Sequence, residues 1–180
     1  MLNVKTASIA TLLSFVALAI GGVSALQAIQ RKPIEVAYQD LHPDARRQVD
    51  CLADNIYFEA RSEPTNGQKA VALVTMNRVS SGSFAPTVCG VVKQVENSTC
   101  QFSWWCDTTI RAKAVHRQFH HEAYQQARLI ALDVYLNYER IHDITKGALF
   151  YHAEYVPKSK IGVPNLQMTV KIGQHIFYRT

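Results

Sequence analysis

The feature that most constrains the fold is an apolar stripe at helical spacing with one acid at its edge. Apolar residues recur three and four positions apart within residues 44–62, which predicts an amphipathic helix packed against a core. We expect Asp44 to cap this helix and Pro64 to end it. Glu59 lies at the edge of the stripe, and Glu63 follows one turn later on the same side. The stripe consists of Val49, Leu52, Ala53, Ile56 and Ala60.

The position of Glu59 indicates chemistry as well as structure. A carboxyl group at the border of an apolar surface tends to keep its proton, because burial disfavours the charged form. A protonated carboxyl is what an enzyme needs in order to donate a proton to a leaving oxygen. From spacing alone, a surface glutamate near a helix end is the simpler interpretation of Glu59.

Helical spacing continues after Pro64 and changes to strand-like alternation near the C-terminus. Helices that come first and a small antiparallel sheet that comes last predict an α+β domain. We expect Asn66 to cap the second helix, and Gly173-Gln174 to form a hairpin turn. The expected elements are helices over 67–80, 88–93 and 115–137, a loop or short hairpin over 100–107, and strands over 148–153 and 167–178.

The N-terminal segment has a different composition from the rest of the chain. Residues 6–30 contain no charged side chain and are long enough to cross a bilayer, which takes about 20 residues. Three interpretations remain open: a signal peptide cleaved after the small residues at 23–25, a permanent signal anchor, and a weak anchor that later leaves the membrane. All three place residues 44–180 on the outer side of the cytoplasmic membrane, in the periplasm where there is one, with 31–43 as a linker.

Composition and charge exclude several classes of protein. Charged residues are 18% and hydrophobic residues 48% of the chain, so intrinsic disorder is excluded. The net charge of +5 comes without a run of five basic residues, which argues against nucleic-acid binding. His116, His120 and Glu122 lack the order of a zinc-protease motif and are expected on a solvated helix face. We expect a monomer with no metal and no cofactor.

The four cysteines fit an exported domain. An even number of cysteines outside the cytoplasm favours disulfides, and four cysteines allow three pairings. Cys100 and Cys106 are close enough in sequence to close a small loop, which leaves Cys51 to pair with Cys89. A zinc site is the alternative, but the chain has no C-x-x-C spacing.

Five blocks of sequence, taken together and in order, resemble a known family. They are 57–78, which contains Glu59-Ala60-Arg61 and Asn77-Arg78, and then 84–92, 100–107, 147–153 and 172–178. The blocks are similar to those of the SleB-type cell wall hydrolases. This resemblance implies a lysozyme-like fold, cleavage of the glycan strands of peptidoglycan, and Glu59 as the catalytic acid. Ser62 is a departure, because the family usually has glycine at that position.

The resemblance also suggests roles for other residues. We expect Gln101, Phe102, Ser103 and Trp104 of the aromatic loop to bind sugar, because rings pack on sugar faces and amides pair with hydroxyls. Tyr151 and His152 are further candidates, although neighbouring side chains on a strand point in opposite directions, so only one is expected to face the cleft. The residues expected to support the site without touching substrate are Glu63, Asn77 and Arg78.

The expected mechanism uses a single acid. A lysozyme-type hydrolase normally needs two carboxylates on opposite sides of the sugar. Glu63 leaves the same helix face as Glu59, and nothing in the sequence selects Glu96, Asp107 or Glu122. A lytic transglycosylase fits better: Glu59 protonates the oxygen between N-acetylmuramic acid and N-acetylglucosamine, and then accepts a proton from the muramyl C6 hydroxyl.

Two other functions remain open. A cysteine peptidase or amidase would pair one cysteine with His152, but a disulfide-bonded sulfur is not a nucleophile. A non-catalytic wall-binding protein tethered to the membrane through residues 6–30 would need no acid at position 59. The sequence also does not separate a bacterial wall-remodelling enzyme from a phage endolysin, or an anhydro product from a hydrolysed one.

Overall fold

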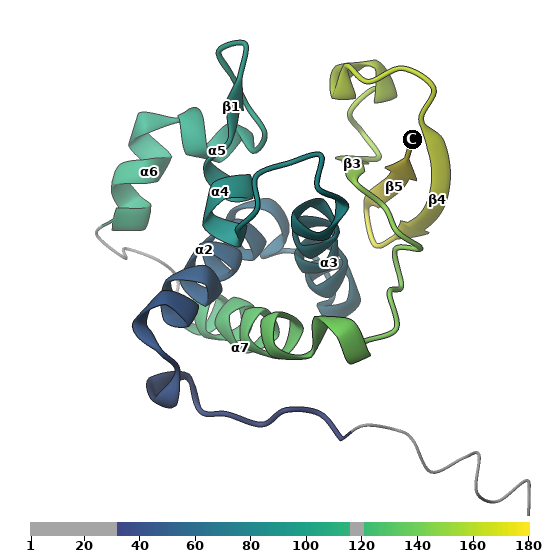
Figure 1. The fold of residues 1–180 in the computed structure, drawn as a ribbon. Helices are drawn as coiled ribbons and strands as arrows, with labels where there is room; N and C mark the ends of the chain where they lie inside the picture. The colour runs from purple at the N-terminus through teal and green to yellow at the C-terminus, as the bar shows by residue number, and fades with distance from the viewer. Residues whose placement is uncertain (1–31, 116–120) are drawn as a thin grey trace, which may run out of the picture. The chain divides into compact units, whose positions relative to one another are not determined.

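The computed structural model describes residues 32–115 and 121–180, and Ile34–Thr180 form one compact unit. This unit has a helical body and two small antiparallel sheets, so the predicted α+β class is confirmed (Figure 1). The elements are η1 Tyr38–Asp40, α2 Pro43–Ala60, α3 Thr65–Ser81, α4 Val88–Lys93, β1 Val95–Glu96, β2 Thr99–Cys100, α5 Ser103–Cys106, α6 Thr108–Val115, α7 His121–Asn137, η2 Tyr138–Arg140, β3 Phe150–Ala153, η3 Lys158–Ile161, β4 Gln167–Ile172 and β5 His175–Arg179.

The expected membrane segment, residues 6–30, lies outside the described residues. In the part of the chain that is described, no helix has the length and apolar character needed to span a bilayer. His116 and His120 also fall outside it, together with the other residues between α6 and α7. Of the single helix expected over 115–137, α7 accounts for His121–Asn137, while Val115 ends α6.

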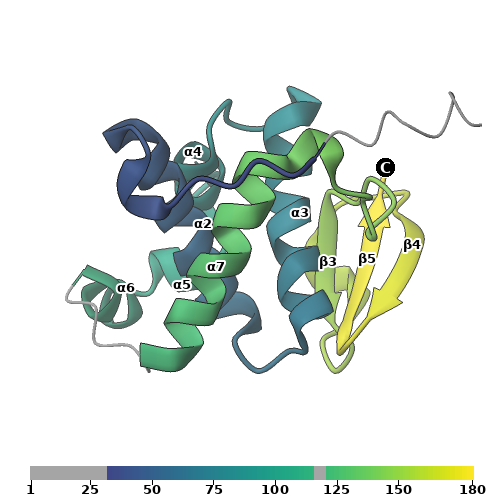
Figure 2. The same cartoon turned by 90° about the horizontal axis from the view of Figure 1, so that it is seen from below.

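Helix α3 lies at the centre of the unit. Figure 2 shows it between α2 and α7 on one side and the three-stranded sheet on the other. Ala70 and Val74 pack against Ala148 and Phe177 of the sheet segment, and the opposite face of α3 joins the main core. Residues 70–78 are all buried, so α3 has no solvent-facing side along this stretch, unlike the one-sided helix that its spacing predicts. Small side chains on α3 allow this close approach from both sides.

The three-stranded sheet has the strand order β3-β5-β4, and both pairs are antiparallel. The predicted hairpin is confirmed, with Gly173 in its turn at a φ of +58°. A second, two-stranded hairpin, β1–β2, stands at the same end of the unit as η3 (Figure 1). β3 is an edge strand, and this position matters for the site described below.

The structure corrects both predicted caps. Helix α2 begins at Pro43, and the side chain of His42 accepts a hydrogen bond from the Asp44 backbone N–H at 3.3 Å, so Asp44 is inside the helix. Helix α3 begins at Thr65 directly after Pro64, without a side-chain cap from Asn66. Proline is favourable next to the first turn because its missing N–H would have no helical partner there.

Both predicted disulfides are present. Cys51 of α2 is bonded to Cys89 of α4, and Cys100 of β2 is bonded to Cys106 of α5. The first bond joins two helices of the body. The second disulfide joins the two ends of the aromatic loop that follows the β1–β2 hairpin.

Two polar clamps hold the sheet to the helices. At one end, the Glu63 carboxylate, which is 4% exposed, accepts a hydrogen bond from the Gln174 backbone N–H at 2.9 Å. At the other end, Asn77 Nδ2 donates to the Ala148 carbonyl at 3.0 Å and Arg78 Nε donates to the Leu149 carbonyl at 2.8 Å. The loop that leads into β3 is further fixed by hydrogen bonds to Asp143 from Asn77, Thr145 and Gly147.

The Glu63 clamp yields a test of stability. A Cβ at Gly173 would lie 1.9 Å from Glu63 Oε2, and the backbone there has a positive φ. We expect Gly173→Ala to lower the free energy of unfolding by about 3 kcal/mol, because the backbone strain and the loss of a buried charge-assisted hydrogen bond add up. Denaturant unfolding followed by circular dichroism measures this change.

Gly82→Ala is the matched control. Gly82 also has a positive φ, but a Cβ there would meet no atom within 4 Å. We expect this variant to lower the free energy of unfolding by only about 1 kcal/mol, which is the cost of the backbone strain. Equal losses for the two variants would show that the Glu63 clamp does not stabilise the hairpin.

Candidate active site

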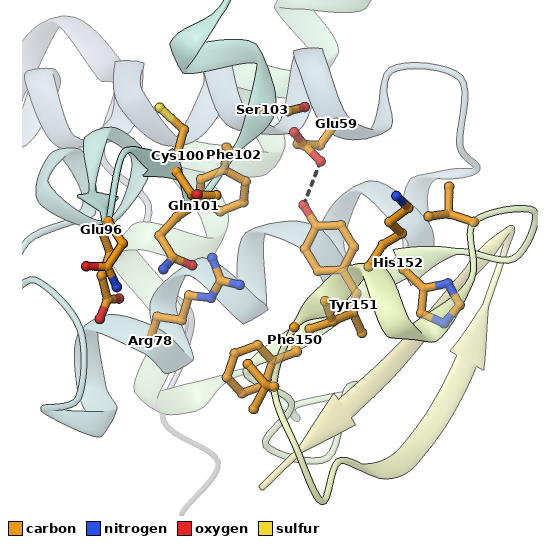
Figure 3. Close-up of a pocket in the computed structure, with 17 residues that line it drawn as sticks. Glu59, Arg78, Glu96, Cys100, Gln101, Phe102, Ser103, Phe150, Tyr151 and His152 are labelled. Carbon is orange, nitrogen blue, oxygen red and sulfur yellow. Dashed lines mark hydrogen bonds between the residues drawn. The ribbon is translucent and has the colours of Figure 1, made fainter.

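A pocket of about 680 Å³ lies between the β1–β2 hairpin and the segment around η3. One wall is formed by the hairpin and residues 100–103, and the other by β3 and residues 156–163. Glu59 and Arg78 reach the pocket from α2 and α3. Residues far apart in the sequence, between positions 59 and 163, therefore meet at this pocket, and Figure 3 shows the labelled side chains.

Glu59 is the half-buried acid of the pocket. It comes from the last turn of α2, at the edge of the apolar face that the sequence predicts. Burial raises the pKa of Glu59 above its ordinary value, and this effect outweighs the hydrogen bond from Tyr151 and the charge of Arg78, which both lower it. A raised pKa favours the protonated form, so the group is suited to donate a proton.

Tyr151 is the direct partner of Glu59. Its hydroxyl donates a hydrogen bond to Glu59 Oε2 at 3.1 Å, from a residue 92 positions away in sequence (Figure 3). Burial and the neighbouring Glu59 raise the pKa of Tyr151 well above its usual range, so the hydroxyl keeps its proton. The Tyr151 ring also contacts those of His175 and Phe177, which fix its orientation. Tyr151 thus orients the carboxyl group.

Arg78 lines the pocket itself, although the sequence predicts a supporting position behind it. Arg78 is 5% exposed, and it donates a hydrogen bond to the carbonyl of Leu149 in the loop before β3. The guanidinium lies 5.0 Å from the centres of the Phe84 and Phe102 rings. Burial lowers the pKa of Arg78, with Tyr151 and Glu59 acting in the opposite direction, and an arginine nevertheless remains charged at neutral pH.

Three residues that the sequence predicts to bind sugar line the pocket: Gln101, Phe102 and Ser103. Phe102 is buried beneath the guanidinium of Arg78, Gln101 is half-buried and Ser103 is exposed. The Gln101 backbone N–H donates to the Gln94 carbonyl at 3.0 Å, which fixes the backbone and leaves the side-chain amide on the pocket side (Figure 3). The amide and the hydroxyl supply polar groups next to an aromatic ring.

The structure corrects the position expected for Trp104. It does not line the pocket, because its ring is 5% exposed in the main core and stacks on Phe58 at 4.6 Å. The indole N–H donates to Asn55 Oδ1 at 3.0 Å, so its polar atom also has a buried partner. Trp104 holds the short helix α5 against the body and is not available to pack on a sugar.

Both Tyr151 and His152 line the pocket, although strand alternation predicts that only one faces it. β3 is an edge strand, and the pocket extends around its open side. Both nitrogens of His152 have partners: Nδ1 is 2.8 Å from the Ala153 carbonyl and Nε2 is 2.9 Å from the Tyr178 hydroxyl. A carbonyl only accepts, so we assign the hydrogen to Nδ1, and Tyr178 donates to Nε2.

Glu63 and Asn77 do not line the pocket; they bind backbone groups of the segments next to it. Glu63 faces the β4–β5 turn, with Gln174 as donor and His175 Nδ1 4.0 Å away. Asn77 holds the loop before β3, and its Oδ1 accepts a hydrogen bond from the Tyr138 hydroxyl at 2.8 Å. Asn77 therefore supports the loop before β3, whereas Glu63 supports the start of β5, the strand that pairs with β3.

Glu59 is the half-buried carboxyl group of the pocket and the one whose pKa is raised. The pocket lining contains one other carboxylate, that of Glu96, which is exposed on the β1–β2 hairpin. Asp107 instead accepts hydrogen bonds from the first backbone N–H groups of α6. Within residues 32–115 and 121–180, no cluster of His, Cys, Asp and Glu is arranged to hold a metal ion. The arrangement suits proton transfer to and from a bound ligand.

Comparison with known proteins gives a consistent result. The Cell Wall Hydrolase family model matches residues 62–178. A spore cortex-lytic enzyme of Bacillus cereus is 31% identical over 133 residues, which are 74% of this chain and 44% of that protein. The corresponding enzyme of Oceanobacillus iheyensis is 44% identical over 48 residues, which are 27% of this chain and 17% of that protein. The chain therefore spans less than half the length of these curated relatives.

Two solved structures share the fold. The catalytic domain of the germination-specific lytic transglycosylase SleB from Bacillus anthracis is 28% identical, with a TM-score of 0.55 over 78% of this chain and 98% of that chain. The catalytic domain of Bacillus cereus SleB gives a TM-score of 0.53, also at 28% identity, over 78% of this chain and 94% of that chain. The family match begins at residue 62, so the case for Glu59 depends on its geometry.

The contact between Tyr151 and Glu59 leads to a prediction about proton affinity. The hydrogen bond stabilises the charged form of Glu59 and so lowers its pKa, while burial raises it. We expect Tyr151→Phe to raise the pKa of Glu59 further, because burial is then opposed by Arg78 alone. A titration of the side-chain carboxyl carbons by NMR measures the change. Tyr155→Phe, at a residue that is 81% exposed, should leave the pKa unaltered, whereas a decrease in Tyr151→Phe would contradict the assignment.

Proposed function

The chain belongs to the Cell Wall Hydrolase family, and from this premise we propose that it degrades peptidoglycan by cleaving the bond between N-acetylmuramic acid and N-acetylglucosamine. We propose a lytic transglycosylase in which Glu59 is the catalytic residue. The observation that carries the proposal is a carboxyl group with a raised pKa in a pocket large enough for saccharides. The lytic transglycosylase named among the similar structures supports the same reaction type.

In the first step, Glu59 donates its proton to the glycosidic oxygen. The bond between that oxygen and C1 of the muramyl residue breaks, and N-acetylglucosamine leaves with a free 4-hydroxyl. Positive charge develops at C1, and the neighbouring N-acetyl group of the substrate stabilises it. Tyr151 holds the carboxyl in place through its hydrogen bond, and that bond strengthens as the carboxylate forms.

In the second step, the Glu59 carboxylate acts as a base. It accepts the proton of the muramyl C6 hydroxyl as the C6 oxygen bonds to C1, which closes a 1,6-anhydro ring. The proton lost in the first step is thereby recovered, and no water is consumed. Arg78 and Tyr151 stabilise the carboxylate between the two steps, because both favour the charged form of Glu59.

The other side chains of the pocket bind substrate in this proposal. Gln101 and Ser103 offer an amide and a hydroxyl to sugar hydroxyls, and Phe102 with Tyr151 offers apolar surface. His152 contributes a rigid wall, because both of its ring nitrogens have partners within the chain. Glu63, Asn77 and Arg78 keep β3, and therefore Tyr151, in position.

The alternative functions receive less support. All four cysteines of the chain are in disulfides, which leaves a cysteine peptidase without a nucleophile. A non-catalytic wall-binding protein does not require a carboxyl with raised proton affinity beside a tyrosine hydroxyl.

We also propose that residues 6–30 bring the domain to the outer side of the cytoplasmic membrane, tethered or released, where the disulfides form and peptidoglycan is accessible.

Digestion of purified sacculi tests the proposed reaction. Glu59→Gln is expected to lower turnover by a factor of about 10²–10⁴, because the amide cannot donate the required proton. The wild-type chain should release muropeptides with 1,6-anhydro ends, identified by mass spectrometry. Reducing ends formed with uptake of water would indicate a hydrolase instead, and release of free peptides by the Glu59 variant would indicate an amidase.

Two further variants check the single-acid mechanism. Glu96→Gln changes the second carboxylate of the pocket, and we expect it to keep most of the turnover. A loss as large as that of Glu59→Gln would instead support a mechanism with two carboxylates. Glu122→Gln, on the exposed side of α7, controls for the loss of one negative charge.

A further inference from the structure

Arg78 is a buried cation that forms no ion pair with a carboxylate among residues 32–115 and 121–180. Its Nε donates to a backbone carbonyl, and its Nη1 is buried with no acceptor among the residues that the structure describes. Three phenylalanine rings surround the guanidinium, at 5.0, 5.0 and 5.8 Å from its carbon. A buried charge that lacks a counter-charge is costly, so such a group normally has a partner. Here the missing partner points to a ligand.

Glu59 does not supply the counter-charge. No ion pair joins the two side chains within the described residues, although each charge affects the pKa of the other group. The carboxylate of Glu59 instead accepts the hydrogen bond of the Tyr151 hydroxyl. Of the other charged residues that line the pocket, Lys160 adds a second positive charge, and Glu96 is exposed on the hairpin. Among the charged residues that line the pocket, Arg78 is therefore the buried positive charge.

The two sugars of peptidoglycan differ in whether they carry an acidic group. N-acetylmuramic acid carries a lactyl ether that ends in a carboxyl group, whereas N-acetylglucosamine is neutral. In strands without peptide the lactyl carboxylate is free, and in peptide-bearing strands it forms an amide while the peptide contributes its own carboxylates. A cation beside the catalytic acid is therefore able to distinguish the muramyl residue from its neighbour.

We propose that Arg78 forms an anion subsite that binds a carboxylate carried by the muramyl residue. This inference rests on the proposed function, because it names the part of the same substrate that the pocket recognises. Binding of the carboxylate would orient the muramyl residue in the pocket so that its glycosidic oxygen reaches Glu59. The same interaction would then recognise the substrate and neutralise the buried charge of Arg78.

The surroundings of Arg78 suit this role. An arginine fork binds a carboxylate through two parallel hydrogen bonds, which gives direction as well as strength. The Leu149 carbonyl fixes the guanidinium through Nε, and the stacked rings hold its plane. Gln101 also lines the pocket, and Figure 3 shows its side chain pointing toward Arg78, so its amide offers a further hydrogen-bond donor.

The test measures binding to the full-length chain with Glu59→Gln, which keeps the ligand intact. Three sets of muramyl oligosaccharides are compared by isothermal titration calorimetry: peptide-free strands with lactyl carboxylates, the same strands converted to primary amides, and peptide-bearing strands. We expect the acid to bind at least about tenfold more tightly than the amide, as is typical of a charge-assisted pair. This comparison needs no change at Arg78.

The peptide-bearing strands identify the source of the anion. Binding as tight as that of the free acid assigns the carboxylate to the peptide, and binding as weak as that of the amide assigns it to the lactyl group. Adding Arg78→Gln should remove the preference for acid over amide, whereas Arg179→Gln, an equal charge change at an exposed strand end, should keep it. Thermal unfolding checks that the Arg78 variant is folded.

Equal binding of acid and amide to the chain that retains Arg78 would overturn the anion subsite. That outcome would leave the proposed function standing, because the digestion of sacculi by the wild-type chain tests Glu59 separately. Conversely, failure of the wild-type chain to cleave any glycan, with the acid preference intact, would refute the reaction and not the subsite. Retention of the preference in Arg78→Gln would place the anion elsewhere and also overturn the proposal.

Discussion

The site depends on how the edge strand β3 is attached to the helical body. Two successive side chains at the end of α3, Asn77 and Arg78, hold the carbonyls of two successive residues, Ala148 and Leu149. Because Tyr151 follows two residues later, its position relative to α2 is set by these hydrogen bonds. The contact between Tyr151 and Glu59 joins residues 92 positions apart, and it exists only if the sheet is docked in one place. Polar side chains buried in this way specify geometry, since an apolar contact alone allows sliding.

The two glutamates of α2 and its following turn illustrate how environment separates roles. Glu59 and Glu63 are one turn apart in sequence, and a helical wheel places them side by side. The structure gives Glu63 a backbone donor in the β4–β5 turn, with glycines at 67 and 173 making room for its carboxylate. Glu59 instead meets a neutral hydroxyl at the edge of a pocket, where burial keeps its proton affinity high. One carboxylate is used as an anchor and the other is left free to exchange a proton.

Local patterns predict much of this fold, and tertiary contacts explain what they miss. The helix carrying Glu59, the final hairpin and both disulfide pairs follow from spacing and composition. The positions of Trp104 and Arg78 do not, because a tryptophan in an aromatic loop and an arginine at a helix end suit either the core or the surface. Their placement is decided by Asn55, which accepts the indole N–H, and by Leu149, which accepts from the guanidinium. Sequence also could not show that β3 is an edge strand, which lets both Tyr151 and His152 reach the pocket.

A charge bound at Arg78 would also act on Glu59. The positive charge of Arg78 lowers the pKa of Glu59 in the unliganded pocket, although burial exceeds this effect. A ligand carboxylate paired with Arg78 would offset that positive charge and displace water from the pocket, and both changes favour the protonated form of Glu59. By linkage, the proton on Glu59 and the anion at Arg78 then strengthen each other's binding. The acid would hold its proton most firmly when a muramyl residue is in place, and would release it only as charge develops on the glycosidic oxygen.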